Sequence, residues 1–226
     1  MKIKSYVITH DHGFAPNPYG GYLTLATCKP QIRRTANVGD IIVATGSRSG
    51  IYKNKLIYAG IICEIMHMDK YFCDPRFEIK KPSNKDECYL QGDNIYYKEH
   101  NDWKQLPNNY HDEEGINHDL KSKNVLICEE FWYFGNNAPL IPENLLEIIK
   151  IGPAHKNISD PKIISEFLDW ISDFQRGLIG KPIGQTSLKV QNCNQPQVSS
   201  KCANSKTPST SQPKAVTCTK NVKPWW

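Results

Sequence analysis

Short apolar runs, separated by polar turns that contain Gly or Pro, recur from the N-terminus to residue 128. Runs of this length, bounded in this way, are typical of β-strands. The predicted strands cover residues 2–9, 22–27, 41–44, 56–65, 93–97 and 125–128. Gly60, inside the longest run, marks either a bulge or a position where another backbone or a ligand comes close.

Helical spacing of apolar residues is clearest after the last of these runs. It predicts a helix over 160–175 and another over 142–149. Two shorter helices are expected at 29–34, with a proline in the first turn, and at 68–72, which ends before a proline. A sheet-rich body with helices near its C-terminal end predicts an α+β fold built on a compact, barrel-like sheet.

The composition of the chain changes after residue 185. Residues 186–226 are rich in Ser, Thr, Asn, Gln, Lys and Pro and contain few large apolar side chains before Trp225 and Trp226. Such a segment buries too little surface to offset the entropy lost on ordering, so we expect it to be a disordered tail. The 226 residues therefore divide into a domain at 1–150, a helical extension packed on it at 151–185, and the tail.

The net charge of +5 comes from the tail rather than from the body. Residues 186–226 hold six lysines, no arginine and no acidic residue, which leaves residues 1–185 with a net charge of −1. The overall charge therefore does not indicate what the folded body binds. The tail itself is suited to weak, salt-sensitive attraction to nucleic acid.

The chain shows no membrane or secretion signal. No stretch approaches the roughly 18 uncharged apolar residues of a membrane helix, and the first residues read as a strand rather than as a signal peptide. The eight cysteines are scattered without a CxxC pair, so free thiols in a reducing compartment are expected. We therefore expect a cytoplasmic protein with no metal site and no cofactor.

The loop after the first predicted strand holds the first candidate chemistry. Asp11 is flanked by His10 and His12, a pattern that suits acid/base catalysis or binding, although polar triplets also occur at strand ends for solubility alone. Two prolines restrict Asn17, whose amide offers a paired donor and acceptor for a base edge. A rigid turn is the alternative interpretation of Asn17.

Two neighbouring segments carry groups suited to phosphate. Lys29, Arg33 and Arg34 fall on one short predicted helix, where they either clamp phosphate or form a solvated face. Ser47 and Arg48 lie in a small, hydroxyl-rich turn that is able to wrap an anion, but it lacks the order of a nucleotide P-loop, and a simple hairpin connection is favoured.

Aromatic and charged residues alternate farther along the chain. The residues in question are Tyr71, Asp74, Arg76, Phe77, Lys80 and Lys81. Such alternation either stacks a base and holds its phosphates or forms an ordinary amphipathic connection. Four consecutive aromatic residues at 131–134 are too many for one face, so at least one is expected to line a pocket or the core edge.

Longer strings of residues along 1–150 carry a resemblance to a known family. They are Asp11-x-Gly13-Phe14-Ala15-Pro16-Asn17-Pro18, Cys28-Lys29-Pro30-x-Ile32-Arg33, Gly39-Asp40, Tyr71-x-x-Asp74-x-Arg76-Phe77-x-x-Lys80-x-Pro82, Gly92-Asp93-Asn94-Ile95-Tyr96, and 131–138 with Pro142. Together they resemble the nucleotide modification associated domain family, second type. Genomic context links this family to phage and bacterial systems that modify DNA bases, so the resemblance implies a role in such a system.

A looser resemblance concerns the fold. The Gly39-Asp40 turn before an apolar strand, the strand that ends in 60–65, and the Tyr71-x-x-Asp74-Pro75 segment are similar to the layout of PUA-like domains of the EVE and ASCH groups. Those domains are small β-barrels with flanking helices, and several hold a nucleobase in a pocket. The resemblance therefore implies a PUA-like barrel.

Three functions remain open. The leading hypothesis is a module that recognises a nucleobase, either unmodified or modified, between the 10–17 loop and the 47–48 turn. In it Asp11 and Asn17 read base edges, Tyr71 or Phe77 stacks, and cations such as Lys80 hold phosphate. The rival is an enzyme acting on a nucleotide or DNA base, with Asp11 or His12 as acid/base. The third is a protein-interaction domain whose tail docks on a partner.

Overall fold

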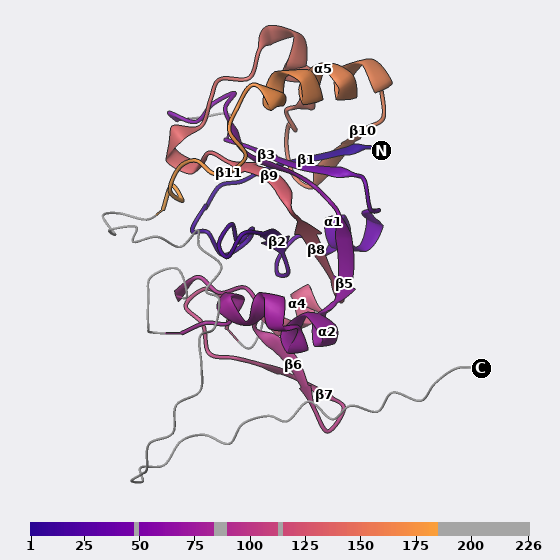
Figure 1. Ribbon diagram of the computed structural model, residues 1–226, viewed down its shortest axis with the longest axis vertical. Coiled ribbons are helices and arrows are strands. Elements are labelled where there is room, and N and C mark those ends of the chain that lie inside the picture. The colour runs from indigo at the N-terminus through magenta and orange to yellow at the C-terminus, as the bar shows by residue number, and fades with distance from the viewer. Residues whose placement is uncertain (48–49, 84–89, 113–114, 185–226) are drawn as a thin grey trace, which may run out of the picture.

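The computed structural model describes residues 1–47, 50–83, 90–112 and 115–184. Arg48 and the predicted tail at 186–226, with its proposed docking role, lie outside the described residues. Within the described part, sheets and short helices are mixed along the chain, which confirms the α+β class (Figure 1).

The larger sheet has six strands in the order β10-β1-β3-β4-β9-β11. Their bounds are β1 (Ile3–Val7), β3 (Ile41–Thr45), β4 (Leu56–Ile61), β9 (Glu130–Tyr133), β10 (His155–Ile158) and β11 (Gly177–Leu178). The β1–β3 and β9–β11 pairs are parallel, and the other pairs are antiparallel. The strand β10 and the helix α5 (Pro161–Ser172) both come from 151–185, so this segment contributes to the main sheet and its core.

A smaller sheet and a hairpin complete the strands. The sheet has the order β2-β8-β5, and β6 pairs with β7. Their bounds are β2 (Leu23–Leu25), β5 (Glu64–His67), β6 (Tyr96–Glu99), β7 (Asp102–Gln105) and β8 (Asn124–Cys128). The chain crosses between the two sheets four times, from β1 to β2, from β2 to β3, from β4 to β5 and from β8 to β9. The described strands close no barrel, so the expected compact barrel is not found among them, and the PUA-like fold stays a prediction.

The helices are short except for the last one. Their bounds are α1 (Pro30–Thr35), α2 (Met68–Cys73), η1 (Pro75–Lys80), α4 (Gly115–Asp119), η2 (Gly135–Asn137), η3 (Glu143–Ile148) and α5. The helices predicted at 29–34, 68–72 and 160–175 are confirmed, and the one predicted at 142–149 is a 3-10 helix. Figure 1 shows α5 above the larger sheet and α2 and α4 at the opposite end, beside the hairpin.

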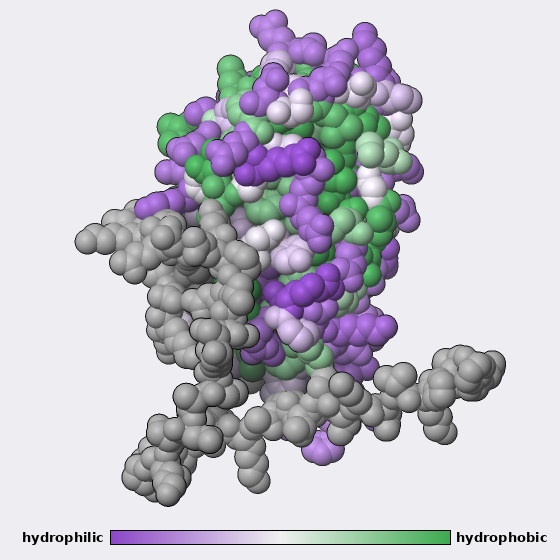
Figure 2. All heavy atoms as spheres, in the orientation of Figure 1, coloured by the Kyte–Doolittle hydropathy of each residue, from purple (hydrophilic) through white to green (hydrophobic). Residues whose placement is uncertain are grey.

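The main core lies where α5 packs on the larger sheet. Ile164, Phe167 and Ile171 of α5 are buried there at helical spacing. All four aromatic residues at 131–134 are buried, because both faces of β9 are covered. On the face shown in Figure 2, apolar side chains are seen mainly around the larger sheet and α5, interspersed with hydrophilic ones.

The predicted close approach at Gly60 is confirmed. A Cβ atom on Gly60 would lie 2.8 Å from Leu23 Cδ2 and 2.9 Å from Cys128 Sγ. These two residues belong to the smaller sheet, so the missing side chain lets the two sheets approach each other.

Two further expectations concern cysteines and membranes. Cys28, Cys63 and Cys128 are free thiols, as expected. Cys73 is disulfide-bonded, so the expectation of free thiols is wrong for that residue. Among the described helices, none has the length and apolar character needed to cross a bilayer.

Candidate functional site

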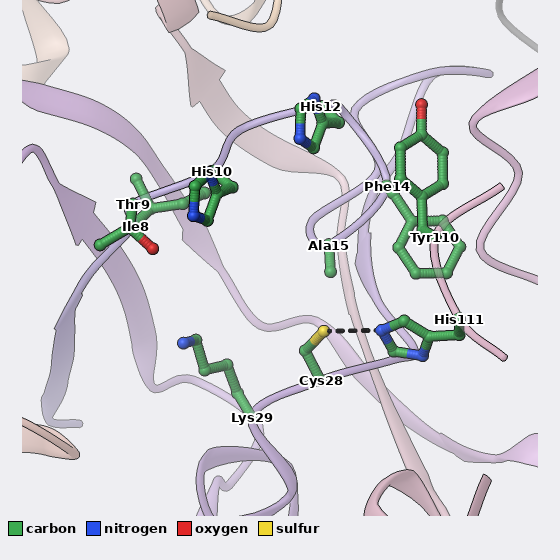
Figure 3. Close-up of a pocket in the computed structure, with 10 residues that line it drawn as sticks. All are labelled: Ile8, Thr9, His10, His12, Phe14, Ala15, Cys28, Lys29, Tyr110 and His111. Atoms are coloured by element: carbon green, nitrogen blue, oxygen red, sulfur yellow. Dashed lines mark hydrogen bonds between the residues drawn. The ribbon is translucent and has the colours of Figure 1, made fainter. Parts of the chain in front are cut away.

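A pocket of about 260 Å³ opens where three segments of the chain meet. The loop after β1 forms one side, the residues just before α1 form the floor, and the segment between β7 and α4 forms the other side (Figure 3). The lining residues are Ile8, Thr9, His10, His12, Phe14, Ala15, Cys28, Lys29, Tyr110 and His111. The volume is near the lower end for small-molecule pockets, about 300 Å³, and suits a single small ring system.

Rings arranged in a row form one wall of the pocket. Phe14 stacks on Tyr110 with the ring centroids 4.9 Å apart, and His12 also stacks on Tyr110, at 5.5 Å. His10 continues the row at 6.3 Å from His12. His111 meets Phe14 edge to face at 5.0 Å. The wall therefore presents flat apolar surface together with polar ring nitrogens, a combination that suits an aromatic ligand.

Two residues of the pocket lining, Cys28 and His111, form a connected row of side chains with the buried Asp119. Cys28 Sγ lies 3.3 Å from His111 Nε2, and His111 Nδ1 lies 2.9 Å from Asp119 Oδ2 (Figure 3). The other carboxylate oxygen, Asp119 Oδ1, accepts the backbone N–H of Cys28 at 2.7 Å. Tyr96 donates its hydroxyl to Asp119 Oδ2 at 2.8 Å. One buried carboxylate thus orients both the imidazole and the backbone that carries the thiol.

This arrangement sets the charge on the imidazole. Burial lowers the pKa of His111, but the hydrogen bonds to Asp119 and Cys28 outweigh it and raise that pKa to about 10. The His111 side chain is 17% exposed and Asp119 is fully buried. His111 therefore carries its proton at neutral pH while one edge remains open to the pocket.

The buried side chain of Arg33 fixes the backbone around Cys28 and Asp119. Its guanidinium is fully buried and donates to the carbonyl oxygens of Cys28 at 2.7 Å, Asp119 at 2.8 Å and Asn124 at 2.9 Å, and also to that of Ser122. These bonds tie the segment before α1 to the segment after α4. Because no part of the guanidinium is exposed, we assign Arg33 to the support of the site and not to phosphate.

The backbone at the floor has an uncommon conformation. Cys28 and Lys29 have φ values of 54° and 40°, in the left-handed region that non-glycine residues rarely enter. The bonds from Asp119 and Arg33 to the backbone of Cys28 keep it there. Lys29 is exposed, with Nζ 4.9 Å from the centre of the Tyr6 ring, and it is the only lysine or arginine among the ten lining residues.

Asp11 lies behind the pocket and does not line it. It is buried and accepts hydrogen bonds from the Tyr133 hydroxyl and from the backbone N–H groups of Gly13 and Ile183. Burial raises the pKa of Asp11, although the bond from Tyr133 opposes the rise. Its contacts therefore connect the 10–17 loop to β9 and to the segment around Ile183. His12, the other candidate acid/base, does line the pocket.

A second buried polar network fixes the far end of the same loop. Lys80 donates to Asn17 O at 3.1 Å, Asn17 Oδ1 at 2.9 Å and Tyr22 O at 2.8 Å. Asp93 accepts from Thr24 at 2.7 Å and from Tyr71 at 2.8 Å. Four residues that the sequence assigned to base or phosphate contact, namely Asn17, Tyr71, Phe77 and Lys80, are thus buried away from the pocket.

Burial shifts the pKa values of the two ionisable residues of this network, Lys80 and Asp93. Burial lowers the pKa of Lys80 to about 8, against the attraction of Asp93. Burial also raises the pKa of Asp93 to about 6, although Lys80, Thr24 and Tyr71 favour the charged form. The two groups therefore stabilise each other's charge inside the protein.

The remaining predicted site residues lie on the surface. Arg76 pairs with Asp74 at 2.8 Å and with Glu64 at 2.9 Å, and its guanidinium lies 4.8 Å from the centre of the Phe77 ring. Arg34 donates to Gln31 at 2.5 Å. Ser47 is half-buried and outside the pocket. Of the twelve predicted binding residues, eleven are described, and of these Lys29 lines the pocket.

Four residues of the site were missed as functional groups. Cys28 was noted only as part of a family-like string, and Tyr110, His111 and Asp119 fall in a polar stretch without a recognisable motif. Cys28 and His111 are 83 residues apart, so no spacing rule connects them. A Cys, a His and an Asp in one chain are too common to signal a triad without the fold.

Among the described residues, no group of three or more His, Cys, Asp or Glu is arranged to hold a metal ion. No curated protein and no solved structure matches the chain. The family model for nucleotide modification associated domain 2 matches residues 1–189, which include the whole pocket and Asp119. The chain therefore belongs to the nucleotide modification associated domain 2 family.

Proposed function

We propose that the protein recognises a nucleobase in the pocket of Figure 3, as part of a base modification system. Family membership indicates the role in base modification. The observation that carries the proposal is the row of rings Phe14, Tyr110 and His12 facing a cavity large enough for one ring system. Any of the bases can stack on such a platform, because every base has a flat aromatic face.

The polar groups of the pocket supply the contacts that a base and its phosphate need. Thr9, His10 and His12 offer hydrogen-bonding groups at the rim, and the exposed Lys29 offers a positive charge for phosphate. A base reaches such a pocket only when it is outside the helical stack. The ligand is therefore a base in a single strand, an extruded base, or a free nucleotide.

A neighbouring hollow favours a polynucleotide over a free nucleotide. This hollow, about 630 Å³, shares His111 with the pocket and is lined by Trp103 of the β6–β7 hairpin. Lys98 and Lys123 lie 5.3 Å and 5.9 Å from the centre of the Trp103 ring. An aromatic ring among lysines suits the adjacent nucleotide of a strand.

Replacement of Tyr110 by alanine tests this proposal. Loss of one stacking ring is expected to weaken binding of a single-stranded oligonucleotide by about 1–3 kcal/mol, which is roughly 5- to 150-fold in Kd. Fluorescence anisotropy with oligonucleotides that contain unmodified or modified bases, at two salt concentrations, measures the change. The higher salt concentration suppresses attraction that is purely electrostatic.

Phe72→Ala provides the matched control. Phe72 is also half-buried, stacks on Tyr97 at 5.0 Å and lies under Lys81 at 4.2 Å, but it lines neither hollow. Its loss is expected to leave the affinity unchanged. Equal affinity of the Tyr110 variant and the wild type, with both folded, would remove the pocket from the binding site.

A further inference from the structure

We propose that Cys28 is a catalytic nucleophile, with His111 as its acid/base and Asp119 as the group that orients them, and that it cleaves an amide or ester carried on the bound base. The carbonyl chemistry follows from the side-chain geometry, and the base-linked substrate rests on the proposed function. The activity expected is removal of an acyl group from a modified base.

The geometry has the three parts that nucleophilic acyl transfer requires. The nucleophile and its base are in contact, with Cys28 Sγ 3.3 Å from His111 Nε2. The base is held from behind, with His111 Nδ1 2.9 Å from Asp119 Oδ2. Cys28 lines a cavity that has an aromatic wall to position the substrate. Such a constellation is recognised by its geometry and roles, not by sequence position.

A comparison of the free cysteines singles out Cys28. Cys128 is fully buried against Gly60. Cys63 is exposed, donates its thiol to Ile127 O at 3.3 Å, and has a pKa raised by burial of the sulfur. Of the described free cysteines, Cys28 alone lines the pocket and contacts an imidazole. A reactive cysteine needs both access and a partner that takes its proton.

The reaction needs only water as a co-reactant. In the attacking form, the proton shared by the pair is on His111 Nε2 and the sulfur of Cys28 is anionic. The sulfur adds to the carbonyl carbon, and Lys29, the lysine that lines the pocket, faces the negative charge that develops on the carbonyl oxygen. The C–N or C–O bond to the base then breaks, and the leaving nitrogen or oxygen takes the proton from His111.

Hydrolysis of the thioester completes the cycle. Water attacks the carbonyl of the acyl group on Cys28 and gives a proton to His111. The C–S bond breaks, the acyl group leaves as a carboxylic acid, and the thiolate–imidazolium pair is restored. No electron is gained or lost, and the base is released with its free amine or hydroxyl group.

The test uses the full chain and two probes. One probe is a deoxynucleotide with an acetyl group on the exocyclic amine of its base, and the other is p-nitrophenyl acetate, which carries no base. Intact-protein mass after rapid mixing, followed by peptide mapping, is expected to show one acetyl group on Cys28, with release of acetate. Cys28→Ser and His111→Ala are expected to lower the rate about 100-fold or more, and Cys63→Ser is expected to leave it unchanged.

Added imidazole separates catalysis from structural support. If His111 acts only through packing, its loss is not repaired by a small molecule, whereas imidazole is expected to restore part of the acylation of His111→Ala. Acetylation of Cys63 instead of Cys28, or equal rates in wild type and Cys28→Ser with both folded, would overturn the proposal.

The two probes separate this inference from the proposed function. Acylation of Cys28 by the ester, dependent on His111 but without binding of any nucleotide, would retain the nucleophile and overturn base recognition. Binding of nucleotides that depends on Tyr110, without acylation of Cys28 by either probe, would retain base recognition and overturn the nucleophile.

Discussion

Lys80→Met is expected to lower the free energy of unfolding by about 3–5 kcal/mol, because it removes the buried donor of three hydrogen bonds and the positive charge that favours the ionised form of Asp93. Lys80 is 1% exposed and gives all three of its described hydrogen bonds to oxygens of Asn17 and Tyr22. Without Lys80, these oxygens lose a donor and Asp93 loses the charge that stabilises it. Urea unfolding followed by tryptophan fluorescence measures the loss.

The double variant Lys80→Met/Asp93→Asn checks the cause. If the loss comes from an unpaired carboxylate, the double variant is expected to be more stable than Lys80→Met alone. A double variant as unstable as the sum of the two single ones would show that Lys80 and Asp93 act independently.

The pH dependence of this deficit has a definite sign. Burial raises the pKa of Asp93 from its ordinary value of 3.8 to about 6. The stability that this group contributes therefore falls as pH rises from the lower to the higher of these two values, because the unfolded chain releases the proton first. Loss of Lys80 moves the pKa of Asp93 higher still, which extends the fall. The deficit of Lys80→Met is therefore expected to be larger at pH 8 than at pH 6.

Arg33→Met is expected to cost a similar amount, about 3–5 kcal/mol, and also to disturb the site. The change removes the donors to four carbonyl oxygens and leaves the buried carboxylate of Asp119 without a cation 3.7 Å away. The carbonyl of Cys28 is one of the four, so its backbone is expected to leave the left-handed conformation. Urea unfolding and the rate of Cys28 alkylation by iodoacetamide measure the two effects.

The adjacent arginine gives the matched control. Arg34 is exposed and donates to Gln31 on its own helix, so Arg34→Met is expected to change stability by no more than about 0.5 kcal/mol. Similar effects of the two variants would show that the pair forms one exposed basic face, as the sequence alone allowed.

Hydrophobic patterning predicted the elements better than their arrangement. The helix at 160–175 and most strands follow from it, because local periodicity records which side is buried. The single run at 56–65 is divided between two sheets at Ile62 and Cys63, a change of partner that leaves no mark on an apolar run. The strands β7, β9, β10 and β11 were not predicted. The residues of β7 and β10 are mostly polar and partly exposed, β11 has two residues, and β9 lies in the aromatic run at 131–134, which has no alternation of polar and apolar residues.

The residues around the pocket were predicted only in part, because the sequence does not show which charged residues are buried. The 10–17 loop and Lys29 do border the pocket. Sequence shows the charge of Arg33 and Lys80 but not their burial, and these two basic residues hold the loops instead of facing the pocket. Tyr110 and His111 lie in the segment between β7 and α4, and Asp119, which contacts His111, ends α4. Hydrophobic periodicity does not encode the long-range contacts that bring this segment to Cys28.

Protection of Cys28 from alkylation tests most directly whether the pocket is the functional site. The rate at which iodoacetamide modifies each free cysteine is measured by peptide mass mapping, with and without a saturating single-stranded oligonucleotide. Modification of Cys28 is expected to slow at least severalfold when a base occupies the pocket, while that of the exposed Cys63 stays constant. Equal rates at Cys28 with and without bound oligonucleotide would contradict the account, because the base would then lie elsewhere.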